Sequence, residues 1–153
     1  MISITEERPD TEAATALILE LEEQLASLYP QESRHGYSVE TMIAKGVAFF
    51  LLRDDAVPAA CGGVQLFGTE YGELKRMYVR PEFRGRGFGS LMLDQLAGYV
   101  RSRGVGVLRL ETGIQQSAAI GLYEQAGFQP IPPFGEYTPD PNSLFYEKRI
   151  RWA

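Results

Sequence analysis

A chain of 153 residues with 44% hydrophobic and 23% charged residues has the composition of one globular domain, which excludes a disordered or fibrous protein. Its net charge of −5 disfavours nucleic acid as a partner, and the lack of an apolar run of about 18 residues disfavours a membrane-spanning segment. One cysteine and an acidic N-terminal region, without the pattern of a secretion signal, lead us to expect a cytoplasmic protein.

The first half of the chain predicts helices followed by strands. Leucines spaced by three or four residues over 17–28 predict an amphipathic helix, which Asp10 can cap and Pro30 ends. The polar segment 31–46 follows, with a short helix expected at 39–44. Three apolar segments separated by turns then predict a strand meander, at 47–53, 59–67 and 73–79.

The second half alternates helices and strands. The expected elements are a helix after residue 89 that ends at Gly104, a strand at 105–112, a short helix capped near Ser117 and ended by Gly127, a proline-rich loop at 130–141 and a strand at 144–150. This order predicts an α+β (mixed α/β) fold in which the single domain 1–153 is built on one sheet.

A glycine-rich loop, Arg84-Gly85-Arg86-Gly87-Phe88-Gly89, joins the third strand to the following helix. Glycine lets a ligand approach the backbone, and a helix N-terminus presents unpaired N–H groups to an anion. The segment 73–89 carries five basic and two acidic residues, a local balance of +3. The loop therefore predicts a phosphate site, although its spacing matches neither a P-loop nor a dinucleotide fingerprint.

The loop resembles the acyl-CoA site of the GNAT superfamily of N-acetyltransferases, whose signature is Arg/Gln-x-x-Gly-x-Gly/Ala, here Arg84, Gly87 and Gly89. The segment 73–79 is similar to the fourth strand of that family, and 122–128 to its Leu-Tyr-Glu-x-x-Gly-Phe motif. The resemblance spans nearly the whole chain. It implies a mostly antiparallel, twisted sheet of six to seven strands flanked by helices, in which the fourth and fifth strands splay apart to admit acetyl-CoA.

The resemblance also implies which residues hold the donor, acetyl-CoA. Backbone groups of the fourth strand would bind the pantetheine arm, and amides of the glycine-rich loop would bind the pyrophosphate. The implied donor-binding residues are Met77, Tyr78, Val79, Arg84, Gly85, Arg86, Gly87, Phe88, Gly89, Ser90 and Gln116. Gln116 stands where the family often has asparagine, so it keeps the amide with a longer reach.

Two residues are implied in catalysis. Tyr123 occupies the position of the tyrosine that protonates the departing thiolate, and a phenol with a pKa of about 10 stays protonated at neutral pH. An amphipathic core tyrosine is the alternative. Glu73 begins the fourth strand, where many relatives place the general base for the amine; the alternative is a strand glutamate paired with Lys75 or Arg76. Glu111 is a second candidate base.

The acceptor is expected between the polar stretch after the first helix and the proline-rich loop. The candidate acceptor residues are Arg34, His35, Tyr37, Arg76 and Tyr137. Arginine pairs well with carboxylates, which would suit an amino-acid-like acceptor; for His35, an isolated surface histidine is the alternative. Cys61 is expected in the core, and no cluster of side chains has metal-ligand spacing, so no metal is expected.

Taken together, the residues and the resemblance predict an enzyme that transfers acetyl from acetyl-CoA to a primary amine of a small molecule. Two alternatives remain open: a protein lysine or N-terminal acetyltransferase, and an acyl-CoA-binding sensor without turnover. A wide acidic groove would favour a protein acceptor, whereas a narrow one roofed by Tyr137 would oppose it. A homodimer is a further option, because members of the family often dimerise.

Overall fold

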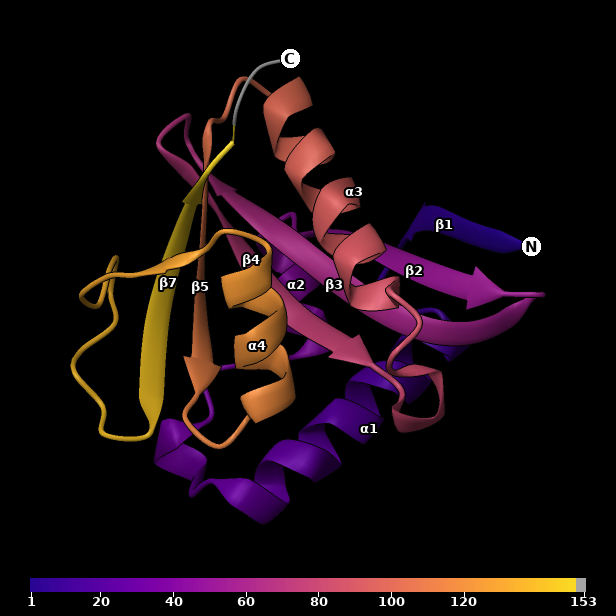
Figure 1. Cartoon of the computed structure of the whole chain (residues 1–153), viewed down its shortest axis with the longest axis horizontal. Helices are drawn as coiled ribbons and strands as arrows, with labels where there is room; N and C mark the ends of the chain where they lie inside the picture. Colours follow the sequence, from indigo (N-terminus) through magenta and orange to yellow (C-terminus); the bar gives the residue numbers. More distant parts are fainter. Residues whose placement is uncertain (151–153) are drawn as a thin grey trace.

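The computed structural model describes residues 1–150, which form one open, seven-stranded sheet with helices on both faces (Figure 1). The strand order is β1-β2-β3-β4-β5-β7-β6, and every pair is antiparallel except the parallel pair β4–β5. The strands are β1 (Ile2–Glu7), β2 (Ala48–Asp54), β3 (Val57–Phe67), β4 (Tyr71–Val79), β5 (Val107–Gly113), β6 (Gln129–Pro130) and β7 (Ser143–Arg149). The expected mixed α/β, mostly antiparallel architecture is confirmed.

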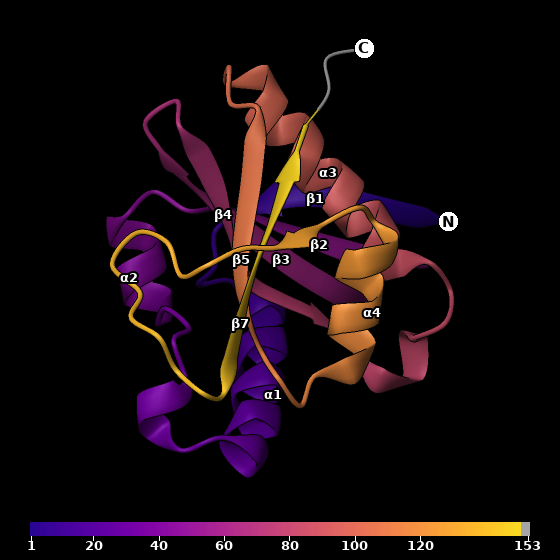
Figure 2. The ribbon, with the colours of Figure 1, turned by 60° about the vertical axis from the view of Figure 1, so that its left-hand side comes forward.

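Four helices cover the sheet, two on each face (Figure 2). They are α1 (Glu12–Leu28), α2 (Val39–Ala44), α3 (Phe88–Ser102) and α4 (Ser117–Gln125). One apolar core lies between the sheet and α3 and α4, and a second lies between the sheet and α1 and α2. The cavities of the candidate site lie where these two layers meet, beside β4 and β5.

Three local expectations were wrong. The strand β1 was not predicted, because most of its side chains are exposed at the sheet edge and its sequence lacks an apolar face. Thr11, not Asp10, caps α1: its side chain accepts the Ala14 N–H, while Asp10 pairs with Arg8. The expected loop at 130–141 begins one residue too early, because Pro130 is the last residue of the short strand β6, which pairs with β7.

The helix α4 begins where it was expected, near Ser117. Its neighbour Gln116 occupies the N-cap position, but the Gln116 side chain makes no capping hydrogen bond. The amide of Gln116 instead lies 3.5 Å from the Thr112 hydroxyl at the end of β5. This side chain is therefore held beside the end of β5, where β5 is no longer paired with β4.

The strands β4 and β5 separate after two paired residues. Gly72 pairs with Leu108 and Glu73 with Arg109, and no further β4–β5 pairs follow within residues 1–150. Gly72 is required at this junction, since a Cβ there would lie 2.8 Å from a methyl group of Val100. The expected splay is present, and it leaves the edge of β4 from Leu74 onward unpaired.

The strand β4 carries one extra residue relative to β3. Gly63 faces Lys75, but Cys61 faces Tyr78, so a bulge lies between them, and Arg76 there has a φ of 55°. The Arg76 carbonyl accepts the Cys61 thiol at 3.4 Å instead of joining the ladder. Because a bulge interrupts the alternation of side chains, Met77 packs against the α3 side and Tyr78 against the α1 side.

Candidate active site

Two cavities meet at the splayed strands. The larger, of about 900 Å³, lies between β4, α3 and α4; the smaller, of about 90 Å³, lies between β4, β5 and the segment after α1. Five residues line both cavities: Leu21, Met77, Gln116, Ala119 and Tyr123. A substrate in each cavity would therefore meet the other at the side chain of Tyr123.

The glycine-rich loop lines the larger cavity. Gly85 and Gly87 have φ of 81° and 80°, and a Cβ at either position would meet no atom within 4 Å. Gly87 is the N-cap of α3, so the N–H groups at the start of α3 are presented beside open space. A left-handed backbone, free space and a helix N-terminus together fit the pyrophosphate of acetyl-CoA.

The two arginines of this loop are held in place by the protein. Arg84 donates from Nε to the Val79 carbonyl at 3.0 Å and from Nη2 to Gln24 at 3.2 Å. Arg86 lies 3.3 Å from the Asp54 carboxylate and stacks over the ring of Phe83. Arg84 thus places a fixed positive charge on the lining of the larger cavity, and Arg86 is held beside Phe83, another residue of that lining.

The open edge of β4 forms one wall of the larger cavity through Met77, Tyr78 and Val79. The Tyr78 side chain points to the other face of the sheet, where its hydroxyl bonds to Glu20 at 3.2 Å. Tyr78 therefore offers backbone groups to this cavity. An unpaired strand edge of this kind can bind an extended chain of amides as an added strand would.

Tyr123 stands at the boundary between the cavities on α4. It is 5% exposed, and its hydroxyl has no hydrogen bond to any residue within 1–150. Burial, and secondarily the negative charge of Glu111, raise the pKa of this phenol. The hydroxyl is therefore protonated across the physiological range and is free to donate.

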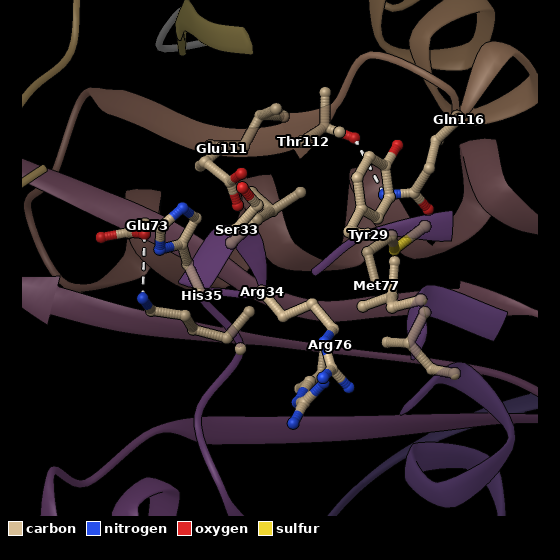
Figure 3. A pocket seen from close by; sticks show the side chains of 18 of the residues that line it. Tyr29, Ser33, Arg34, His35, Glu73, Arg76, Met77, Glu111, Thr112 and Gln116 are labelled. Atoms are coloured by element: carbon tan, nitrogen blue, oxygen red, sulfur yellow. Dashed lines mark hydrogen bonds and ion pairs between the residues drawn. The ribbon is translucent and has the colours of Figure 1, made fainter. Parts of the chain in front are cut away.

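Glu73 forms part of the smaller cavity and is 3% exposed. Its Oε2 accepts both the Lys75 ammonium at 2.9 Å and the Tyr137 hydroxyl at 2.6 Å (Figure 3 marks the Lys75 pair). Lys75 Nζ also lies 3.8 Å from the centre of the Tyr37 ring. Glu73 thus forms the ion pair with Lys75 that was the alternative to its role as a base, and Tyr137 is bonded to the same carboxylate oxygen.

Glu111 is the other acidic residue that lines the smaller cavity. Its Oε2 accepts the Ser143 hydroxyl at 2.7 Å, and it forms no ion pair with a described residue. Burial raises the pKa of this carboxyl, while Ser143 and His35 oppose the shift. Figure 3 shows Glu111 on the β5 wall, between the Glu73 end of the cavity and the end that holds Met77 and Gln116.

His35 is built into the smaller cavity rather than isolated on the surface. Its side chain is 26% exposed, and Nε2 lies 3.3 Å from Asp140 Oδ2 in the proline-rich loop. Asp140 Oδ1 also accepts the Asn142 N–H at 2.8 Å and the Ser33 hydroxyl at 3.2 Å, and these bonds, with the backbone bond first, lower the pKa of Asp140. The ring of His35 meets Tyr137 edge-on at 5.6 Å.

The two arginines near this cavity differ in their partners. Arg76 is 6% exposed on its side chain and donates to Glu22 at 2.6 Å and to the Tyr37 carbonyl at 2.8 Å. Gly36 lies against this guanidinium, where a Cβ would be 2.5 Å from Cζ. Arg34 is exposed, lines the cavity and has no ion pair within the described chain. Arg76 therefore fixes the segment around Gly36, and Arg34 remains available to a ligand.

Some residues of the site gave no signal in the sequence. Tyr29, the C-cap of α1, accepts the Gln115 N–H at 2.8 Å and so joins α1 to the β5–α4 loop. Gly113 makes room for it, because a Cβ there would lie 2.1 Å from the Tyr29 hydroxyl. Asp140 was missed because its partner lies 105 residues away.

The described residues offer neither a metal-binding cluster nor a membrane-spanning helix. Among residues 1–150, no group of three or more His, Cys, Asp or Glu side chains could hold a metal ion. No helix of this part of the chain is long and apolar enough to cross a membrane. Cys61 is buried within β3, and burial raises the pKa of its thiol to about 12, so it is not a nucleophile of this site.

Sequence relatives of this chain are acetyltransferases. Residues 13–128 match the model of the Acetyltransferase (GNAT) family. The chain is 40% identical over 151 residues to the IAA acetyltransferase of Azospirillum brasilense, covering 97% of this chain and 98% of that protein. It is 31% identical over 137 residues to an uncharacterised N-acetyltransferase of Bacillus subtilis, covering 88% and 91%.

Solved structures agree with this. A Klebsiella pneumoniae protein assigned as an acyl-CoA N-acyltransferase superposes with a TM-score of 0.84 at 34% identity, over 99% of both chains. An N-acetyltransferase of Thermoplasma acidophilum, crystallised with coenzyme A, has a TM-score of 0.72 at 17% identity over 97% and 99%, which supports the fold alone. The family model, the relatives and the site agree: the chain belongs to the GNAT family of acetyltransferases, enzymes whose acyl donor is acetyl-CoA.

Proposed function

We propose that this protein transfers acetyl from acetyl-CoA to the primary amine of a small molecule. The observation that carries the proposal is the meeting of a donor-sized cavity of about 900 Å³ with a chamber of about 90 Å³ at Tyr123. Tyr137 roofs the chamber through its bond to Glu73. Such a chamber admits a small amine and opposes an acceptor on a protein surface.

On the donor side, acetyl-CoA supplies an activated acyl group, and the chain supplies its position. The N–H groups of the Gly87–Ser90 turn hold phosphate, and the free edge of β4 at Met77 to Val79 holds the amides of the arm. A backbone N–H of β4 stabilises the negative charge that develops on the carbonyl oxygen during attack.

Tyr123 acts on the departing sulfur. Its raised pKa keeps the hydroxyl neutral, so it donates a hydrogen bond to the developing thiolate. A phenol is a weaker acid than a thiol, which means that Tyr123 stabilises the leaving group mainly as a donor and recovers any transferred proton from the acceptor nitrogen or solvent.

Two charged side chains that line the smaller cavity have no ion-pair partner within residues 1–150, and their charges have opposite signs. Glu111 lies inside the chamber without a cationic partner, whereas Arg34 lines the same chamber and is exposed. Glu73 and Lys75 neutralise each other. This arrangement suits an amine at Glu111 and a carboxylate at Arg34, which describes an amino-acid-like acceptor.

The test is release of free thiol from acetyl-CoA over a panel of acceptors: small amino acids, their amides, polyamines, aminoglycosides and peptides. We expect turnover with small amines, and a higher kcat/KM for an amino acid than for its amide. Preference for peptides would overturn the small-molecule acceptor. Calorimetric binding of CoA without turnover across the whole panel would show a sensor instead.

A further inference from the structure

We propose that His35, oriented by Asp140, is the group that accepts the proton of the acceptor ammonium, either directly or through one water. The inference rests on the proposed function, because only an amine acceptor requires this step. An amine is mostly protonated at neutral pH and must lose a proton before its lone pair can attack a thioester. Of all side chains, imidazole is the one whose ordinary charge change falls closest to neutral pH.

The carboxylate of Asp140 determines which nitrogen of His35 is available. Three donors converge on this carboxylate: the Asn142 N–H, the Ser33 hydroxyl and His35 Nε2. The lowered pKa of Asp140 keeps it ionised, and an ionised carboxylate only accepts hydrogen bonds. Nε2 must therefore carry the proton, so that the lone pair of the neutral imidazole lies on Nδ1.

Nδ1 is the nitrogen that can serve the cavity. His35 lines the acceptor chamber, and none of residues 1–150 forms a hydrogen bond with its Nδ1. The segment that carries His35 is fixed on both sides, by Ser33 bonded to Asp140 and by the Tyr37 carbonyl bonded to Arg76. A base held by a third group and left open on its reactive nitrogen has the arrangement found in catalytic triads.

The carboxylates nearby are less suited to this role. Glu73 Oε2 already accepts Lys75 and Tyr137, so protonating it would break a buried ion pair. Glu111 has one oxygen bonded to Ser143, and in this proposal its charge holds the ammonium while His35 removes the proton.

Charged and titratable side chains from several elements line the cavity of His35 or contact its ring. β4 contributes Glu73, Lys75 and Arg76, β5 contributes Glu111, the proline-rich loop contributes Tyr137 and Asp140, and the segment of His35 itself contributes Arg34. Lys75 is paired with Glu73 and Arg76 with Glu22, so Asp140 and Glu111 are the carboxylates of this group that have no lysine or arginine partner within residues 1–150.

The protons balance as follows. The ammonium gives one proton to Nδ1 of His35, and the resulting amine forms the new C–N bond as the C–S bond breaks. The nitrogen then loses its second proton, which replaces the one that the sulfur receives by way of Tyr123. His35 finally returns its proton to solvent, and one proton is released for each amide formed.

The test compares His35→Gln with the unmodified protein over pH 6–9, using the best amine of the panel. We expect kcat/KM for the acceptor to fall at least tenfold at pH 7, since a general base contributes roughly 10²–10⁴. The loss should shrink towards pH 9, where more of the amine is neutral, and the KM for acetyl-CoA should not change. Added imidazole should partly restore the activity of His35→Ala.

Asp140 is a positioning residue, and its variants separate charge from geometry. Asp140→Asn keeps an acceptor for Nε2–H and should move the acid limb of the profile to lower pH with a partial loss of rate, whereas Asp140→Ala should lose more. Full activity of His35→Gln at pH 7, or an equal loss at every pH without imidazole rescue, would overturn this assignment alone. Lack of turnover by the unmodified protein with every amine would overturn the proposed function as well.

Discussion

The hydroxyl of Tyr137 donates to Glu73 Oε2 at 2.6 Å, and this bond helps to join the proline-rich loop to β4. Lys75 shares the same oxygen at 2.9 Å. Burial, the Glu73 charge and this bond all raise the pKa of Tyr137, so its proton stays on the hydroxyl and the bond persists at neutral and mildly alkaline pH. The roof of the acceptor chamber is therefore attached to its wall by a charge-assisted hydrogen bond.

Removing this bond should loosen the roof. Tyr137→Phe leaves the Glu73–Lys75 pair in place, and hydrogen bonds to charged groups contribute about 1.5–3 kcal/mol. We expect the KM for the acceptor to rise several-fold and stability to fall by about 1–2 kcal/mol, measured by steady-state kinetics and urea unfolding. Tyr99→Phe, on α3 away from the chamber, is the control. Unchanged acceptor KM in Tyr137→Phe would contradict the role of the roof.

The buried ion pair should respond asymmetrically to substitution. Lys75→Met leaves the Glu73 carboxylate buried without its cation, which typically costs about 3–5 kcal/mol. The double variant Glu73→Gln/Lys75→Met should recover most of that stability in urea unfolding. If the double variant were as unstable as Lys75→Met, packing of the lysine stem rather than charge would explain the loss.

The glycine-rich loop allows a test of donor binding with a matched control. Gly87→Ala places a Cβ on a residue with a φ of 80°, which costs roughly 1–2 kcal/mol, and fills space reserved for phosphate. We expect the KM for acetyl-CoA to rise about tenfold or more. Gly98→Ala, inside α3 with nothing within 4 Å, should leave that KM unchanged and stabilise the protein by about 1 kcal/mol. Equal KM values for the two variants would exclude the loop from donor binding.

Tyr123→Phe should lower kcat while sparing donor binding. The ring still fills the same buried space beside Phe128, and only the unbonded hydroxyl is lost. We expect kcat to fall several-fold or more with an unchanged KM for acetyl-CoA, measured by thiol release. Because the pKa of Tyr123 is raised, the kcat profile of the unmodified protein should show no alkaline decline from this group up to about pH 10. Full turnover in the phenylalanine variant would remove Tyr123 from the chemistry.

Glu111 should make stability depend on pH in a defined direction. Its folded-state pKa is raised, so its contribution is fully present below the unfolded pKa and is lost as pH rises through the folded value. Glu111→Gln removes that loss, so the variant should gain stability relative to the unmodified protein as pH rises from the ordinary pKa of glutamate, about 4.3, into the neutral range, measured by urea unfolding. It should also weaken turnover of cationic amines. A constant stability difference across this range would contradict the raised pKa.

The parts of this protein that follow local rules could be predicted from sequence. Apolar segments separated by turns located β2 to β4, helical spacing located α1 and α3, and the glycines before Phe88 located the turn at which α3 begins. The strand β1 was not predicted, because an exposed edge strand needs no apolar face. Local pattern thus located most of the elements that line the larger cavity.

The acceptor side depends on contacts between distant segments, and so it was less accessible. Asp140 lies 105 residues from His35, and Tyr137 lies 64 residues from Glu73. The spacing of residues along the chain does not indicate that such distant residues pair. The engagement of Arg76 with Glu22 and the Tyr37 carbonyl likewise follows from where α1 packs, which residue type alone could not reveal.

The bulge at Arg76 makes the length of β4 as important as its composition. In a strand with regular alternation, Lys75 and Met77 would lie on the same side of the sheet. The extra residue at the bulge shifts this alternation, so that Met77 packs on the α3 side and Tyr78 on the α1 side. Loss of one residue at this point would exchange the two sides for every residue that follows. Shortening this strand by one position would therefore be far more disruptive than any single substitution in it, because it would misdirect the donor wall and the helix contact of Tyr78 together.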